Sequence, residues 1–176
     1  MILAFCDLHL RRIDQQDLEL LRQWRNDEKI TRHMFFRDYI SREMQLDWFA
    51  SLKENDYYFI IEYKKAALGL INLADFNLEM TRCSAGLFIY NEAYWGGPIP
   101  VLASICLLDF AFENLKVQEV WAKVQKDNLA ARKYNEQLGF VIDSEEWQVL
   151  KLNQFKQITS RIKATILSHY NKKSRT

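Results

Sequence analysis

Stretches with the apolar spacing of strands alternate with stretches that have the spacing of helices along almost the whole chain. Seven stretches predict strands, at residues 3–13, 57–63, 67–74, 83–90, 118–124, 140–143 and 147–152. Helix signals lie between them, so the elements follow the order β-α-α-β-β-β-α-β-α-β-β-α. This order predicts an α/β fold in which a mixed central sheet of about seven strands is flanked by helices.

The length and composition predict one globular domain. The chain has 176 residues, of which 49% are hydrophobic and 27% are charged, and these values exclude wholesale disorder. No repeat or linker interrupts residues 1–170, which we take as the domain. Residues 171–176 are predicted to form a basic, disordered tail.

Charge and cysteine usage exclude several kinds of partner. The chain carries 24 Lys and Arg against 23 Asp and Glu, whereas a protein that coats nucleic acid needs a basic excess. The apolar N-terminus ends at Asp7, too soon for a signal peptide or a membrane span. The three cysteines are far apart, so we expect no metal site, reduced thiols and a cytoplasmic location.

Two of the predicted helices bear on the shape of the domain. Ser41 is expected to cap a helix in which Met44, Trp48 and Leu52 share an apolar face. A last amphipathic helix over residues 153–170 either covers the sheet or forms a homodimer contact, and the sequence leaves both open.

Residues 94–100, Tyr-Trp-Gly-Gly-Pro-Ile-Pro, form the only cluster of glycine and proline in the sequence. They join the strand at 83–90 to the start of a helix. Such a helix N-terminus offers free N–H groups and a positive dipole end to a phosphate. The same residues also suit a plain tight turn with proline at the first helical position. Neither a phosphate-binding Gly-Lys-Ser/Thr loop nor a G-x-G-x-x-G fingerprint is present.

The stretch that begins at Asn128 resembles the signature of the GCN5-related N-acetyltransferase (GNAT) family. That signature follows a strand and is written N-x-x-A-x-x-x-Y-x-x-x-G-F. Here Asn128, Ala131, Tyr134, Gly139 and Phe140 supply its residue types.

Two further stretches are similar to the same family. They are the helix end at 109–115 and the Trp-Arg-Asn element at 24–26, which resembles the branch that acetylates amino sugars and ribosomal proteins. The resemblance extends over residues 7–152 and implies a fold in which two parallel strands of the sheet splay apart.

The resemblance implies acetyl-CoA as the co-substrate, bound where the strands at 83–90 and 118–124 separate. The pantetheine arm would pair with backbone groups of Leu87, Phe88 and Ile89. The pyrophosphate would lie on the turn formed by Trp95, Gly96, Gly97, Ile99 and Val101. The pantetheine would also meet Asn128 and Ala131.

The resemblance further implies that Tyr134 is the catalytic acid that protonates the departing thiolate. A phenol with a pKa of about 10 suits this role, because the pKa of a thiol is about 8.5. The alternative reading of Tyr134 is a core tyrosine with a satisfied hydroxyl.

The turn departs from the family pattern Arg/Gln-x-x-Gly-x-Gly/Ala. Trp95 replaces the cation, and Pro98 and Pro100 replace the small residues. Because proline has no N–H, we expect weaker cofactor binding.

The acceptor wall is expected at Arg25 and at residues 33–36, which fold over the acceptor pocket in similar enzymes. Arg25 suits a phosphate, and Met34 and Phe35 suit a nucleobase or a sugar. Their alternative readings are a surface arginine and a loop that packs into the core. Ser84 occupies the position of the base in many relatives but cannot act as a base unaided, so no base is identified.

These residues predict transfer of an acetyl group from acetyl-CoA to a primary amine of a small molecule. A nucleotide-linked amino sugar is the expected acceptor. The alternatives are a protein N-terminus, as in the ribosomal branch, and a degenerate module that binds CoA without turnover.

Overall fold

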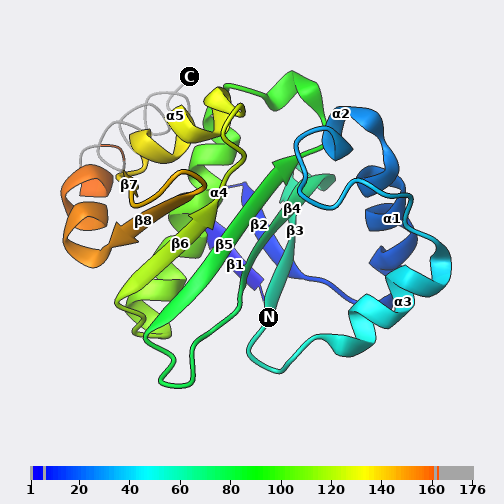
Figure 1. Ribbon diagram of the computed structural model, residues 1–176, viewed down its shortest axis with the longest axis horizontal. Coiled ribbons are helices and arrows are strands. Elements are labelled where there is room, and N and C mark those ends of the chain that lie inside the picture. The colour runs from blue at the N-terminus through cyan, green and yellow to red at the C-terminus, as the bar shows by residue number, and fades with distance from the viewer. Residues whose placement is uncertain (1, 6, 161, 163–176) are drawn as a thin grey trace.

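The computed structural model describes residues 2–5, 7–160 and 162. Over these residues eight strands form one sheet in the order β1-β2-β3-β4-β5-β6-β8-β7 (Figure 1). The strands are β1 (Ile2–Phe5), β2 (Leu8–Arg12), β3 (Tyr57–Tyr63), β4 (Ala66–Ala74), β5 (Arg82–Ile89), β6 (Glu119–Lys123), β7 (Val141–Ile142) and β8 (Trp147–Lys151). Each neighbouring pair is antiparallel except β5 with β6, which confirms the predicted mixed sheet.

The sheet has one strand more than the sequence predicted, because residues 3–13 form two strands. β1 and β2 are an antiparallel hairpin that closes at the pair Phe5 and Leu8. Asp7 lies in the turn between them, and a short acidic side chain favours such a reversal. The prediction of a single strand across Asp7 was therefore wrong.

Six α-helical segments surround the sheet over the described residues, namely the one at 152–160 and five that carry labels. The labelled helices are α1 (Leu18–Asn26), α2 (Glu28–Thr31), α3 (Arg42–Ser51), α4 (Pro98–Asp109) and α5 (Leu129–Gln137). Short 3₁₀ turns occupy Gln15–Asp17 and Glu92–Tyr94, and a π-helical turn over Phe110–Asn114 extends α4. Residues 152–160 are also helical.

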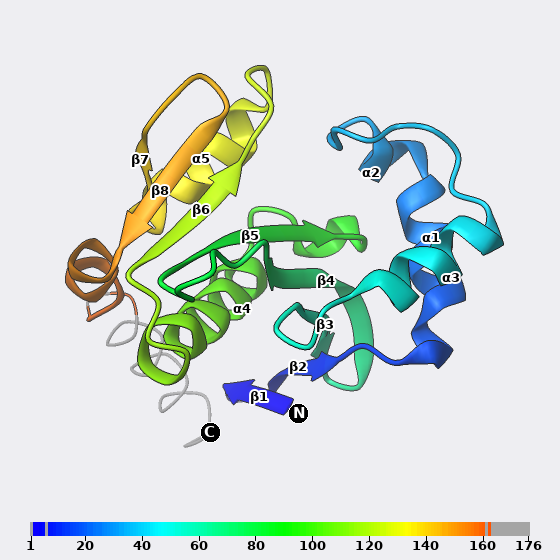
Figure 2. The same ribbon diagram turned by 60° about the horizontal axis from the view of Figure 1, so that its bottom comes forward.

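The sheet is covered on both faces. Phe59 and Ile61 of β3 belong to the core that α4 completes, whereas Ile60 packs with Leu21 and Trp24 of α1 on the opposite face. Neighbouring strand residues point to opposite faces, so one strand serves both cores. Figure 2 shows α4 on one side of the strands and α1 with α3 on the other side.

The sheet opens between its two parallel strands. β5 and β6 pair only over Arg82–Ser84 and Glu119–Trp121. Beyond Ser84, β5 stays paired with β4 as far as Ile89, and β6 stays paired with β8 as far as Lys123. Figure 2 shows the two strands diverging from that point. The edge of β5 that faces β6 is therefore open beyond Ser84, as the resemblance implied.

No helix within residues 2–5, 7–160 and 162 is long and apolar enough to cross a membrane. The predicted tail at 171–176 and the later part of the last predicted helix lie outside the described residues.

Candidate active site

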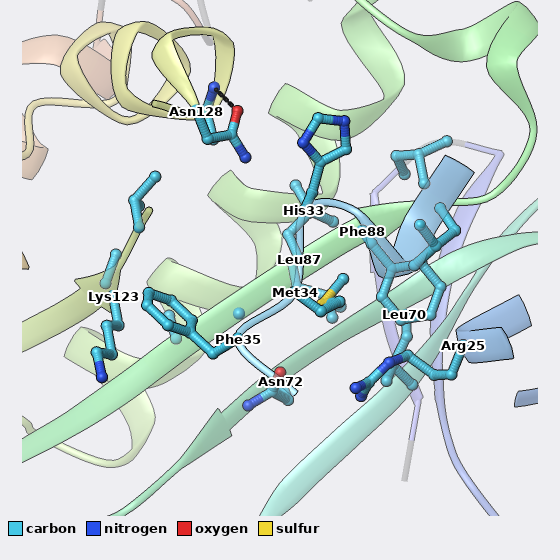
Figure 3. A pocket seen from close by; sticks show the side chains of 18 of the residues that line it. Arg25, His33, Met34, Phe35, Leu70, Asn72, Leu87, Phe88, Lys123 and Asn128 are labelled. Atoms are coloured by element: carbon cyan, nitrogen blue, oxygen red, sulfur yellow. Dashed lines mark hydrogen bonds between the residues drawn. The ribbon is translucent and has the colours of Figure 1, made fainter. Parts of the chain in front are cut away.

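A pocket of about 800 Å³ lies where β5 and β6 separate. One wall comes from α1, α2, α3 and the segment that joins α2 to α3, and the other comes from α4, β6 and α5. The floor is formed by β4 and β5 (Figure 3). The pocket thus has room for two ligands that approach from opposite walls.

The open edge of β5 presents the backbone of Leu87 to the pocket. The Tyr90 N–H donates to the Leu68 carbonyl of β4 at 2.7 Å, and Phe88 is two residues earlier and opposite Leu70. Backbone groups alternate in direction along an antiparallel strand, so Phe88 faces β4 and Leu87 faces the open edge. Of the three residues predicted to pair with pantetheine, we therefore retain Leu87.

Ile89 also turns its backbone to the open edge, but its carbonyl oxygen is already bonded. Trp95 Nε1 donates to this oxygen at 2.8 Å. Trp95 thus lies against the end of β5 and lines the pocket as a hydrogen-bond donor to the protein itself. Trp95 therefore uses its one side-chain donor on the sheet edge.

The first turn of α4 has few amide groups to offer to a phosphate. Pro98 and Pro100 occupy its first and third positions, and the Gly97 N–H already donates to the Tyr94 carbonyl at 3.2 Å. Among the first three helical positions only Ile99 carries an N–H. Gly96, with φ +69°, gives the turn its left-handed step.

Four of the residues predicted for the phosphate turn do not line the pocket. They are Gly96, Gly97, Ile99 and Val101. The structure therefore does not bring these four residues into the pocket that Trp95 lines.

The start of α5 is built as the sequence predicted. Asn128 Oδ1 accepts a hydrogen bond from the Ala131 N–H at 3.1 Å and so caps the helix. Gly139 follows the helix end with φ +96°, a conformation that favours glycine. Asn128 and Ala131 both line the pocket, so this cap places the helix N-terminus beside the open edge of β5.

Tyr134 lies on the α5 wall, where α4 holds its hydroxyl group. The hydroxyl donates to the Pro100 carbonyl oxygen at 2.8 Å, and Ser104 Oγ lies 2.7 Å from it on the accepting side. Burial raises the pKa of Tyr134 well above its ordinary value. The phenol therefore keeps its proton, but it is a weaker acid than an exposed tyrosine.

The position of Tyr134 on the helix differs from the family pattern by one residue. The pattern has tyrosine seven residues after the asparagine, whereas Tyr134 follows Asn128 by six, and the seventh residue is Asn135. Asn135 Nδ2 donates to Gln148 Oε1 at 3.0 Å. Both Tyr134 and Asn135 line the pocket.

The opposite wall contains an arginine without a partner. Arg25 is half-buried at the end of α1, and its Nε is buried and has no hydrogen-bond partner among the described residues. Burial lowers the pKa of this guanidinium below its ordinary value, as expected for a desolvated cation. Figure 3 shows the side chain on the pocket wall, near Leu70 and Phe88.

The charged residues that line the pocket are all basic. Besides Arg25 they are Lys29, which lies 3.7 Å from the centre of the Tyr90 ring, and Lys123, which lies 4.4 Å from the centre of the Phe35 ring. No Asp or Glu lines the pocket. Lys29 pairs with Asp27 and Glu92, at 3.7 Å and 3.9 Å, and Lys123 pairs with Glu146 at 3.5 Å. Arg25 is therefore the pocket cation that has no ion pair among the described residues.

The structure brings most of the predicted site residues together. Met34 and Phe35 line the pocket, as do Arg25 and Tyr134. Ser84 does not, because it lies where β5 and β6 are still paired, opposite Trp121. We therefore place Ser84 outside the site.

Several residues of the pocket had no sequence signal. They are polar side chains on a strand, a loop and a helix, namely Asn72, Gln125 and Ser104. Only the pairing of β4 with β5 and the packing of α4 reveal them. No cluster of three or more metal-ligating side chains occurs in the described part of the chain.

The parted strands and the two-walled pocket define an α/β fold with an open strand edge beside a pocket. A model of the Acetyltransferase (GNAT) domain matches residues 7–141. The chain therefore belongs to the GNAT acetyltransferase family, and the predicted fold, enzyme class and N-acetyltransferase activity are confirmed.

Individual relatives differ in the acceptor that their names state. Acetyltransferase PseH of Campylobacter jejuni is 30% identical over 136 residues, which cover 76% of this chain and 83% of that protein. Apo FdhC, described as a nucleotide-linked sugar GNAT, has a TM-score of 0.76 at 18% identity and covers 92% of this chain and 96% of its own.

A spermidine N-acetyltransferase is similar to the same extent in structure. The Vibrio cholerae enzyme, solved in complex with CoA and spermine, has a TM-score of 0.77 at 18% identity. The alignment covers 86% of this chain and 99% of that one. At this identity the likeness establishes the fold only. The acceptor has to be inferred from the residues that line the pocket.

Proposed function

We propose that the protein transfers the acetyl group of acetyl-CoA to a primary amine of a nucleotide-linked amino sugar. The observation that carries this proposal is the buried, unpartnered Nε of Arg25 in a pocket without carboxylates. A desolvated guanidinium costs free energy unless an anion pairs with it. A phosphate of the acceptor supplies that anion, and Arg binds phosphate through paired hydrogen bonds.

The same charges disfavour a polyamine acceptor. A polyamine carries several positive charges, which would meet Arg25 and find no carboxylate among the residues that line the pocket. Asp27, Glu92 and Glu146 lie close by, but they already pair with Lys29 and Lys123. Like charges in a partly desolvated site repel one another. We therefore prefer an anionic acceptor, although spermidine acetyltransferases resemble this chain in both fold and sequence.

Aromatic side chains at the acceptor end support a nucleotide. Trp48 and Tyr58 meet edge to face, with ring centres 5.0 Å apart, and both line the pocket. Phe35 and Phe36 line it from the segment between α2 and α3 and remain 47% and 45% exposed. Planar rings of this kind suit stacking with a base.

The donor side suits the pantetheine arm of acetyl-CoA. Leu87 offers backbone groups on an open strand edge, and Asn128 and Ala131 present the start of α5 to the same space. The attacking amine forms an N–C bond while the C–S bond breaks. The thiolate takes up a proton, and the proton that the amine loses replaces it on the donor. Tyr134 is the proposed donor to the thiolate, and its hydroxyl must turn from Pro100 to the sulfur to act.

An acetyl-transfer screen tests the proposal. The purified protein is incubated with acetyl-CoA and, in separate reactions, a uridine-diphosphate amino sugar, spermidine and an N-terminal peptide, and thiol release is measured. Preference for the nucleotide sugar is expected. Preference for spermidine or for the peptide would refute the proposed acceptor, and acetyl-CoA binding without transfer to any amine would support the non-catalytic alternative.

A further inference from the structure

An asparagine side chain, that of Asn72, lies on the floor of the pocket in space that a neighbouring glycine leaves open. Asn72 of β4 lies opposite Gly86 of β5. A Cβ atom at Gly86 would lie 2.7 Å from Asn72 Oδ1, and the three atoms nearest to it all belong to Asn72. The amide therefore extends from β4 across Gly86, toward the open edge of β5. Figure 3 shows it between Arg25 and Lys123.

The amide of Asn72 is not held by the protein. No hydrogen bond joins this side chain to another group among the described residues, although Asn72 is half-buried on the pocket floor. Other asparagines differ, because Asn26 bonds both ends of its amide to the backbone of Ile40, at 2.9 Å and 2.8 Å. A half-buried amide without partners is suited to a ligand that supplies them.

The chemistry of the pocket indicates which group that ligand brings. Acyl transfer requires a neutral amine with a free lone pair, and no carboxylate lines the pocket to hold an ammonium ion instead. The amides of Gln125, Asn128 and Asn135 are already engaged by protein groups. Asn72 Oδ1 is thus an uncharged acceptor on the floor, between the two walls.

We propose that Asn72 binds and orients the acceptor amine, an inference that rests on the proposed acetyl transfer but not on the identity of the acceptor. Oδ1 accepts one N–H of the neutral amine, so the nitrogen lone pair points to the thioester carbon on the Leu87 side. The N–C bond forms, the C–S bond breaks, Tyr134 protonates the departing thiolate, and the proton that leaves the amine restores the phenol of Tyr134. Asn72 itself gains and loses no proton.

Gly86 supports this role because its lack of a side chain leaves space for the Asn72 amide. A side chain at residue 86 would collide with Asn72 Oδ1 and displace it, because the three atoms nearest to a Cβ at this position all belong to Asn72. Asn72 and Gly86 are therefore coupled, and a double-mutant cycle reports the coupling.

The test measures steady-state kinetics of Asn72→Ala, Gly86→Ala and the double variant with the best amine from the screen. Asn72→Ala is expected to lower kcat/KM for the amine about tenfold and to leave KM for acetyl-CoA unchanged. Gly86→Ala is expected to cause a similar loss in the parent and no further loss in the Asn72→Ala background. Thermal unfolding verifies that each variant is folded.

A charged variant tests the pH–rate profile, which would not shift if Asn72 had only a structural role. Asn72→Asp places a carboxylate beside the amine, which stabilises the ammonium form, so the rising limb of the pH–rate profile should move up by about one pH unit. Asn55→Ala serves as control, because its amide bonds to Met80 Sδ and it does not line the pocket.

Two results would overturn the inference. The first is a kcat/KM for Asn72→Ala within twofold of the parent, and the second is an unchanged pH profile for Asn72→Asp. Any amine that is acetylated suffices for these measurements. The screen can therefore refute the proposed amino sugar while the kinetics confirm the role of Asn72. Equally, the screen can support the amino sugar while the kinetics refute the role of Asn72.

Discussion

The side-chain amide of Gln125 joins the two walls of the pocket, because its Nε2 donates to the Met34 carbonyl oxygen at 2.7 Å. Its Oε1 accepts from Arg37 Nη2 at 3.0 Å, and Arg37 Nε donates to the same Met34 carbonyl at 3.0 Å. Gln125 follows β6, whereas Met34 and Arg37 lie between α2 and α3. Two hydrogen bonds thus connect the acceptor wall to the donor wall, and the bond from Arg37 to Met34 braces the segment on the acceptor side.

Gln125→Leu is expected to loosen the segment at 33–37. Leucine keeps most of the side-chain volume but removes two hydrogen bonds, each worth about 1 kcal/mol, so the segment should open about thirty times more often. Amide hydrogen exchange at residues 34–37 measures the opening, and KM for the acceptor should change with it. Gln137→Leu, at the exposed end of α5, is the control. Equal exchange in both variants would mean that Gln125 does not hold the segment.

Tyr134→Phe tests the proposed acid. The hydroxyl donates to Pro100 and its pKa is raised by burial, so its share in catalysis should be modest. We expect kcat to fall about tenfold while the affinity for acetyl-CoA stays the same. Ser104→Ala is the companion variant, since it removes the bond on the accepting side. A lower melting temperature with an unchanged kcat would show that Tyr134 only ties α5 to α4.

The double variant Pro98→Ala and Pro100→Ala is expected to bind acetyl-CoA more tightly. It returns two N–H groups to the first turn of α4, where the parent has only that of Ile99. One new charge-assisted bond is worth about 1.5 kcal/mol, so Kd should fall at least about tenfold. Calorimetric titration measures Kd. An equal Kd in a folded variant would mean that the phosphates do not lie on this turn.

Arg25→Met is expected to stabilise the fold and to damage acceptor binding. Methionine removes a desolvated cation whose Nε has no partner, which should raise the free energy of unfolding by about 1 kcal/mol. KM for an anionic acceptor should rise at least about tenfold, because a charge-assisted bond is lost. Arg42→Met, on the exposed start of α3, is the control. A destabilised variant with normal KM would show that Arg25 serves the fold alone.

Local signals predicted most of the fold. The turn at Lys64 and Lys65 has positive φ at both residues, as a two-residue hairpin requires. The cap at Asn128 and the glycine at 139 fix both ends of α5. Each of these features depends on residues close together in the chain, so the sequence contains the whole signal.

Features that depend on distant residues were not predictable from the sequence. In α3 the apolar pattern placed Met44 on the buried face, yet Met44 is 43% exposed and Gln45 is buried. Both residues line the pocket. The face of α3 that carries Met44 thus faces an open cavity, which the apolar pattern could not indicate. Asn72 lies in the site because of the register between β4 and β5. Ser84 lies outside the site because β5 and β6 are still paired at that residue.

The bond between Trp95 and the Ile89 carbonyl also bears on self-association. An unpaired strand edge can recruit a strand from another molecule, and β5 has such an edge beyond Ser84. Trp95 closes one end of that edge and the parallel pairing with β6 closes the other. What remains between these two ends is a short open edge, which limits the number of backbone hydrogen bonds that any added strand could make.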